Sequence, residues 1–117
     1  MKISEIRDLL DAELLCGREH LDYDVESACC SDMMSDVLAY VKDQGVLITG
    51  LINPQVIRTA NMMDILCVVF VRSKTPTAEM IELAEECGIA VMTSSHRAYE
   101  ACGILWANGL STDMGDR

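Results

Sequence analysis

The chain has 117 residues, half of them hydrophobic, and a formal net charge of −10 at pH 7. This length fits one domain, and the apolar half is enough to bury a core unaided. The acidic excess, most of which lies in the first 44 residues, argues against non-specific nucleic-acid binding and against an anionic membrane surface. Both would require an excess of Lys and Arg.

The amino-terminal region carries no sign of a signal peptide, since Met1-Lys2 leads directly into an amphipathic segment. No apolar run approaches the ~20 residues that a transmembrane helix needs. The six cysteines lack the spacing of a disulfide scaffold. We therefore expect a cytoplasmic protein with reduced thiols.

The first third of the chain predicts two helices and one strand. Ser4 can cap a helix that runs to about Leu15, and Gly17 follows as a stop signal. Residues 18–24 are polar and predict a surface connection. Residues 25–30 predict a strand, and a helix over about 33–43 follows it, capped by Ser31-Asp32 and with a buried stripe of Met34, Val37, Leu38 and Val41.

The middle of the chain alternates between apolar runs and helical segments. The runs are rich in Val and Ile and show little alternation, which is typical of strands covered on both faces. The helical segments begin at a capping residue followed by proline, and Gly88 fits a left-handed helix end. The runs are 46–48, 65–71 and 89–92, and the proposed caps are Asn53-Pro54 and Thr75-Pro76.

The last element is a helix over about 97–108, which Ser94 or Ser95 could cap. Its apolar face is predicted to contain Tyr99, Cys102, Leu105 and Trp106. We expect residues 111–117 to form a flexible tail. Alternating strands and helices predict parallel strands joined by right-handed crossovers. The expected fold is an α/β three-layer sandwich over residues 1–110, with a mostly parallel sheet of about four to five strands and helices on both faces.

Polar and cationic residues follow the three central strands. Ligands of open α/β sheets bind beyond the carboxyl ends of the strands, where helix N-termini favour anions. These loops predict a pocket for a nucleotide or a phosphorylated or carboxylated metabolite. The alternative is that they hold only helix caps and solvated side chains. The candidate ligand-binding residues are Thr49, Gly50, Asn53, Arg58, Arg72, Lys74, Thr93, Ser94 and His96.

Other chemistry has weaker support. The sequence around Gly50 matches neither a P-loop nor a dinucleotide fingerprint, so a tight turn is the simpler role for this glycine. No C-x-x-C motif occurs, and adjacent Cys29 and Cys30 would point to opposite faces of a strand. His96 and Glu100 lie one helical turn apart, but no nucleophile motif accompanies them. We therefore expect no catalytic residues, no metal and no cofactor.

Three segments resemble the DRTGG domain family, and the similarity extends over Cys29 to Leu110. Members of this family are regulatory domains of bacterial phosphotransacetylases and CBS-domain pyrophosphatases, and the family is related to the N-terminal domain of HPr kinase/phosphorylase. The segments are residues 31–38, 46–50 and 83–94, and Tyr99-Glu100-Ala101 continues the match. Where family members carry a Gly-Asp-Arg-Thr-like element, this chain has Gly50-Leu51-Ile52-Asn53.

The resemblance implies a ligand-sensing module that is dimeric and not itself catalytic. Stand-alone members look similar to proteins encoded beside iron-only hydrogenase subunits and serine-kinase-like regulators, which implies such a protein partner. Methionines near the predicted helix surfaces, such as Met33, Met62 and Met80, also fit an adaptable homodimer interface. Two alternatives remain open, namely an iron–sulfur or redox accessory protein of a hydrogenase-like system and a pure interaction module.

Overall fold

The structure is a computed structural model that describes residues 1–40 and 45–110. Its centre is a five-stranded sheet in the order β1-β5-β4-β3-β2. β2, β3, β4 and β5 are mutually parallel, while β1 pairs antiparallel with β5 at one edge. The strands are β1 (Glu13–Cys16), β2 (Ser27–Cys30), β3 (Gly45–Thr49), β4 (Cys67–Phe70) and β5 (Ala90–Thr93).

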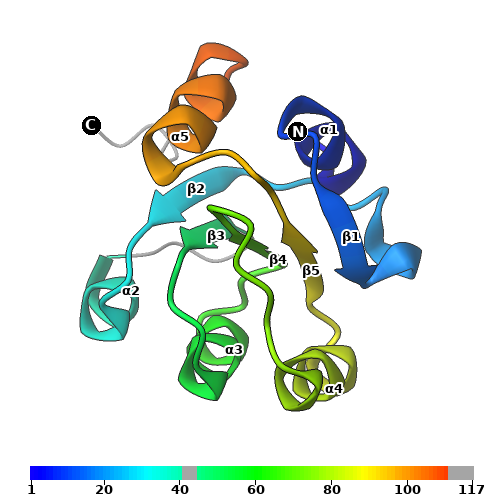
Figure 1. Ribbon diagram of the computed structural model, residues 1–117, viewed down its shortest axis with the longest axis vertical. Helices are drawn as coiled ribbons and strands as arrows, with labels where there is room; N and C mark the ends of the chain where they lie inside the picture. Colours follow the sequence, from blue (N-terminus) through cyan, green and yellow to red (C-terminus); the bar gives the residue numbers. More distant parts are fainter. Residues whose placement is uncertain (41–44, 111–117) are drawn as a thin grey trace.

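Helices cover both faces of this sheet, which confirms the predicted three-layer α/β sandwich. Figure 1 shows α2, α3 and α4 on one face and α1 and α5 on the other. No helix in the described ranges is long and apolar enough to span a membrane. The helices are α1 (Ile3–Leu9), α2 (Met34–Tyr40), α3 (Pro54–Met62), α4 (Ala78–Cys87) and α5 (Ala98–Ala107), with a short 3-10 helix η1 (Arg18–His20).

Two apolar clusters form the core, one on each face. Successive residues of a strand point to opposite faces, so Val68 packs under α3 and α4 while Val69 packs under α1 and α5. Every residue of β3 and β4 is buried. This burial on both faces explains why the central runs lack alternation in the sequence.

The first predicted helix is wrong in its second half. The structure ends α1 at Leu9, and Asp11 adopts a left-handed backbone conformation with φ 49°. Glu13–Cys16 then forms the edge strand, in which Glu13 aligns with Thr93. Pairing with the free backbone of β5 outweighs the helical spacing of the leucines.

Helix starts were predicted with mixed success. The Asn53 side chain accepts a hydrogen bond from the Gln55 N–H at 2.8 Å, and Gly88 ends α4 at φ 73°, as predicted. Thr75 is not the cap of α4, because Thr77 caps it by accepting from the Met80 N–H at 3.2 Å. Neither Ser94 nor Ser95 caps α5, whose N-cap residue is Arg97.

The apolar stripes of α5 and α2 also differ from the prediction. In α5, Leu105 is buried and Cys102 half-buried, but Tyr99 is 90% exposed and Trp106 58% exposed. In α2, Val37 is buried and Leu38 is 42% exposed. The predicted end of that helix at residues 41–43 and the predicted tail at 111–117 lie outside the described residues.

Candidate functional site

The carboxyl ends of β2, β3, β4 and β5 meet at one edge of the sheet, because these four strands are parallel. β1 is antiparallel, so its first residue, Glu13, lies beside Thr93 at the same edge. The loops that follow the central strands in the sequence are therefore neighbours in space. This edge is the candidate functional site.

Asp32 joins two of these loops. Its Oδ1 accepts hydrogen bonds from the Thr49 hydroxyl at 2.7 Å and from the Gly50 N–H at 2.9 Å. The pKa of Asp32 is lowered, most strongly by the hydrogen bond from the Gly50 N–H. The hydrogen bond from the Thr49 hydroxyl and the positive charge of Arg72 lower it further. The ionised carboxylate thereby fixes the loop after β2 to the end of β3.

Gly50 allows a close approach by Arg72. A Cβ placed on Gly50 would collide with the Arg72 guanidinium. Gly50 does not adopt a left-handed backbone and does not form a turn, so the tight turn predicted for it is wrong. The absence of a side chain leaves room for the guanidinium above the end of β3.

The turn after β4 has an unusual backbone. Arg72 and Ser73 are both left-handed, with φ 59° and 55°, a conformation that non-glycine residues adopt at a cost of roughly 1–2 kcal/mol each. The Arg72 N–H donates to the His96 carbonyl at 2.8 Å, and the Ser73 N–H donates to the Ser94 carbonyl at 2.9 Å. These bonds hold the turn against the loop after β5.

An open hollow of about 470 Å³ lies between these two loops, lined by Arg72, Ser73, Ser95 and Arg97. All four residues are exposed. Neither arginine forms an ion pair with another residue in the described ranges. Two guanidinium groups and two hydroxyls are donors suited to a phosphate or carboxylate.

A second hollow of about 270 Å³ shares Ser73 and Ser95 with the first one. Its lining also includes the carboxylates Asp11 and Glu13, together with Thr75, Thr93 and Ser94. Carboxylates accept hydrogen bonds but repel anions, so this part of the edge suits hydroxyl or amino groups. The two hollows together offer opposite chemistry to the two ends of a ligand.

Several predicted site residues support the loops by hydrogen bonds, and two of them, Thr93 and Ser94, also line the second hollow. Thr49 and Ser94 are each 1% exposed. The Ser94 hydroxyl donates to the Leu10 carbonyl at 2.8 Å, and the Thr93 hydroxyl donates to the Lys74 carbonyl at 2.7 Å. These hydroxyls stabilise the edge from beneath.

The remaining predicted residues divide between the edge and the helix surface. Asn53 serves as the cap of α3, and Arg58 lies further along that helix and lines neither hollow. The side chain of Lys74 is exposed, but it lines neither hollow. His96 contributes its carbonyl to the Arg72 N–H. Of the predicted cations Arg58, Arg72 and Lys74, only Arg72 lines the first hollow, of about 470 Å³.

Sequence reasoning missed Asp32, Ser73, Ser95 and Arg97 as site residues. Asp32 was interpreted as a helix cap and Arg97 as the first residue of a helix. Arg97 did carry a usable signal, because Glu100 stands three residues later. The Glu100 carboxylate accepts from the Arg97 N–H at 3.0 Å, which identifies Arg97 as the residue before the helix, beside the loop.

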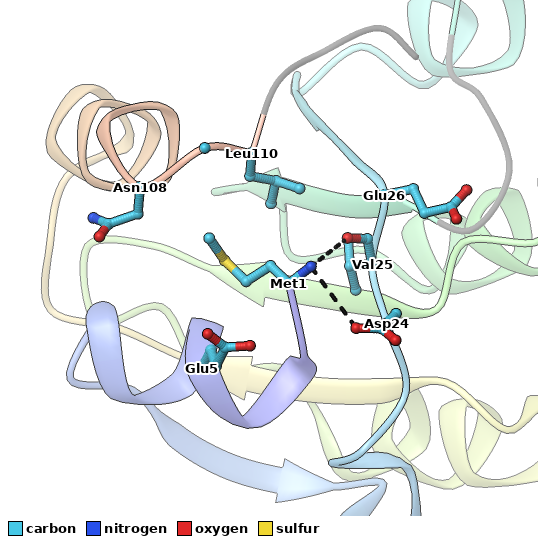
Figure 2. Close-up of a pocket in the computed structure, with 8 residues that line it drawn as sticks. Met1, Glu5, Asp24, Val25, Glu26, Asn108 and Leu110 are labelled. Atoms are coloured by element: carbon cyan, nitrogen blue, oxygen red, sulfur yellow. Dashed lines mark hydrogen bonds and ion pairs between the residues drawn. The ribbon is translucent and has the colours of Figure 1, made fainter.

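A larger hollow of about 770 Å³ lies at the other end of the molecule, beside the end of α5 (Figure 2). Glu5, Asp24 and Glu26 line it, and the Met1 ammonium already donates to the Val25 carbonyl at 3.2 Å. The carboxylates give this hollow a net negative charge, which repels an anion. Within the described ranges, no group of three or more His, Cys, Asp or Glu residues is arranged to hold a metal ion.

Comparisons with known proteins place the chain in a family. No curated protein matches it. A crystal structure of the CBS and DRTGG domains of the regulatory region of Clostridium perfringens pyrophosphatase, complexed with the activator diadenosine tetraphosphate, is similar with a TM-score of 0.75 and 20% identity. The match covers 89% of this chain and 45% of that one, so this chain spans less than half of its length. The sequence profile of the DRTGG domain matches residues 5–106, and the chain therefore belongs to the DRTGG domain family.

Proposed function

We propose that this chain is a non-catalytic cytoplasmic regulatory domain that binds a small anionic ligand at the carboxyl edge of its sheet. The observation that carries the proposal is the hollow lined by Arg72 and Arg97, two exposed arginines on an otherwise acidic protein. The net charge of −10 repels anions, so the rest of the surface is not expected to bind one.

The neighbouring carboxylates favour a nucleotide over a simple phosphate. Phosphate oxygens fit the guanidinium groups and the hydroxyls of Ser73 and Ser95. Sugar hydroxyls or a base amino group could donate to Asp11 and Glu13 in the adjoining hollow. The pyrophosphatase regulatory region with the similar fold was crystallised with a dinucleotide activator, which agrees with this class of ligand.

A thermal-shift series tests the proposal. The probes are inorganic pyrophosphate, ATP and diadenosine tetraphosphate, because a ligand that binds only the folded state raises its melting temperature. We expect ATP or diadenosine tetraphosphate to raise the melting temperature more than pyrophosphate does. Arg72→Glu should abolish the rise, whereas Arg58→Glu, the same charge change on α3 away from the hollows, should retain it. An unchanged response of Arg72→Glu would remove this residue from the site.

The signal would leave the domain through α5, which we propose as the interface with a second copy of the chain. This helix is apolar on its buried face and on its outer face, where Tyr99 and Trp106 are exposed. A helix with apolar residues all round is normally covered on all sides. A hydrogenase-related or kinase-like regulator is the other partner to which the resemblance points.

The oligomeric state tests this interface. Sedimentation velocity should show a dimer for the unmodified chain and a monomer for the double variant Tyr99→Ser/Trp106→Ser. Leu38→Ser is the matched control, because Leu38 is an apolar residue that is 42% exposed on α2 in the opposite layer. A monomer at all concentrations before any substitution would rule out the homodimer.

A further inference from the structure

Three cysteines gather where the end of β2 meets α5. Cys29, Cys30 and Cys102 line a small cavity of about 80 Å³, and apolar residues complete its walls: Ala28, Ile48, Leu105, Trp106 and Leu110. Figure 1 shows α5 lying on the β2 side of its layer. This cavity shares no lining residue with the arginine-lined hollow, and Trp106 connects it with the α5 surface proposed above as the dimer interface.

Cys30, at the end of β2, and Cys102, on α5, face each other across this small cavity. Their side chains lie near enough for each thiol to perturb the pKa of the other. Cys30 is exposed and Cys102 is half-buried, so solvent molecules can reach the pair from the Cys30 side. Cys29 packs with the core of the opposite face, and burial raises its pKa, so it does not compete as a nucleophile.

The two thiols differ in acidity. The hydrogen bond from Cys30 lowers the pKa of Cys102 to about 7, while the same bond and burial raise the pKa of Cys30. A thiol whose pKa lies near the ambient pH combines a substantial thiolate fraction with high nucleophilicity. Cys102 is therefore the attacking group, and Cys30 is the resolving thiol beside it.

We propose that Cys30 and Cys102 form a reversible disulfide by exchange with a low-molecular-weight disulfide such as glutathione disulfide. The Cys102 thiolate attacks one glutathione sulfur, forms a mixed disulfide and displaces a glutathione thiolate. Cys30 then passes its proton to solvent and attacks the Cys102 sulfur, which releases the second glutathione thiolate. The protein pair loses two electrons, and the two glutathione molecules gain them.

A redox titration tests this proposal on the full chain. The protein is equilibrated in buffers with a rising ratio of glutathione disulfide to glutathione, quenched with acid, denatured and alkylated. We expect alkylated thiols to fall from six to about four, with one linked peptide that contains Cys30 and Cys102. Trp106 is the only tryptophan and lines the same cavity, so its fluorescence should change in parallel. Dithiothreitol should reverse both changes.

Variants separate this pair from the other thiols. Cys30→Ser, at an exposed position, should fold normally and accumulate the mixed disulfide of Cys102 with glutathione, because the resolving thiol is gone. Cys102→Ser should yield no internal bond. Cys87→Ser, which changes a half-buried cysteine on α4, should form the Cys30–Cys102 bond as the unmodified chain does. Six free thiols at every buffer ratio, or a linkage that omits either Cys30 or Cys102, would overturn the proposal.

Discussion

At the scale of single residues, Asp32 supports the candidate site most directly. It is exposed, yet it accepts hydrogen bonds from Thr49 and Gly50, two residues at the end of β3. Thr49 is buried and the Arg72 guanidinium lies over Gly50, so the Asp32 carboxylate holds the backbone on which Arg72 rests.

We expect Asp32→Ala to lower the free energy of unfolding at pH 7 by about 1–2 kcal/mol, because the Gly50 N–H and the Thr49 hydroxyl lose their acceptor. The folded-state pKa of Asp32 is lowered, so its contribution is complete above the unfolded-state value and is lost as the pH falls through the folded-state pKa. The difference between the two proteins should therefore shrink below about pH 4. Urea unfolding at several pH values measures the difference in unfolding free energy between the unmodified chain and Asp32→Ala. Asp22→Ala, at an exposed position, is the control. A difference that does not change with pH would contradict the role of the ionised Asp32 carboxylate.

Gly17, which follows β1, and Gly50, which follows β3, make a contrasting pair. A Cβ on Gly17, at φ 89°, would lie 2.5 Å from the Cα of Ala90, whereas a Cβ on Gly50 would meet only the flexible end of Arg72. Gly17→Ala should cost more than about 2 kcal/mol in unfolding free energy. Gly50→Ala should cost less than about 1 kcal/mol but weaken ATP binding, because it displaces the guanidinium. Equal losses of stability, or undiminished ATP binding by Gly50→Ala, would argue against this difference.

At the scale of elements, the sequence predicted what depends on local signals. The Asn53-Pro54 start of α3, the Gly88 end of α4 and the three central strands follow from caps and from runs of buried residues. The strand Glu13–Cys16 could not be predicted in this way, since its leucines fit a helix and only pairing with β5 makes it a strand. The candidate site shows the same division between features with local sequence signals and features that depend on the folded structure.

The loops of the site and Arg72 were predicted, but Ser73, Ser95 and Arg97, which also line the hollow, were not. Parallel topology alone brings the loops after β3, β4 and β5 together. Which side chains line the hollow depends on the left-handed turn at Arg72 and Ser73, for which the residue types give no signal. Ser94 shows that a polar loop residue can serve the fold, because its buried hydroxyl donates a hydrogen bond to the Leu10 carbonyl.

The start of α4 provides a direct test at this scale. Thr77→Ala should lower the free energy of unfolding by about 1 kcal/mol, because the Met80 N–H loses its capping partner. Thr75→Ala, the position that the sequence favoured, should change it by less than about 0.5 kcal/mol. Chemical denaturation of the two variants compares them. A larger loss for Thr75→Ala would mean that the helix begins earlier than the structure indicates.

At the scale of the whole molecule, two hollows of opposite charge lie at opposite ends of the sandwich. Arg72 and Arg97 line the hollow at the carboxyl edge of the parallel strands, whereas Glu5, Asp24 and Glu26 line the hollow beside the end of α5. An anion is therefore attracted to the arginine-lined hollow and repelled from the hollow beside α5. This attraction should weaken with ionic strength, because the arginines are exposed and screened by salt.

The location of ligand binding is the central claim, and amide chemical-shift mapping measures it most directly. In a titration of the isotope-labelled chain with ATP at low salt, we expect saturable shifts at the backbone amides of Gly50, Ser73, Ser95 and Arg97. Arg72→Glu should remove these shifts, and the amides of Glu5 and Asp24 should stay unchanged. Shifts concentrated around Glu5 and Asp24, or no shift at millimolar ATP, would contradict an anion site at the carboxyl edge.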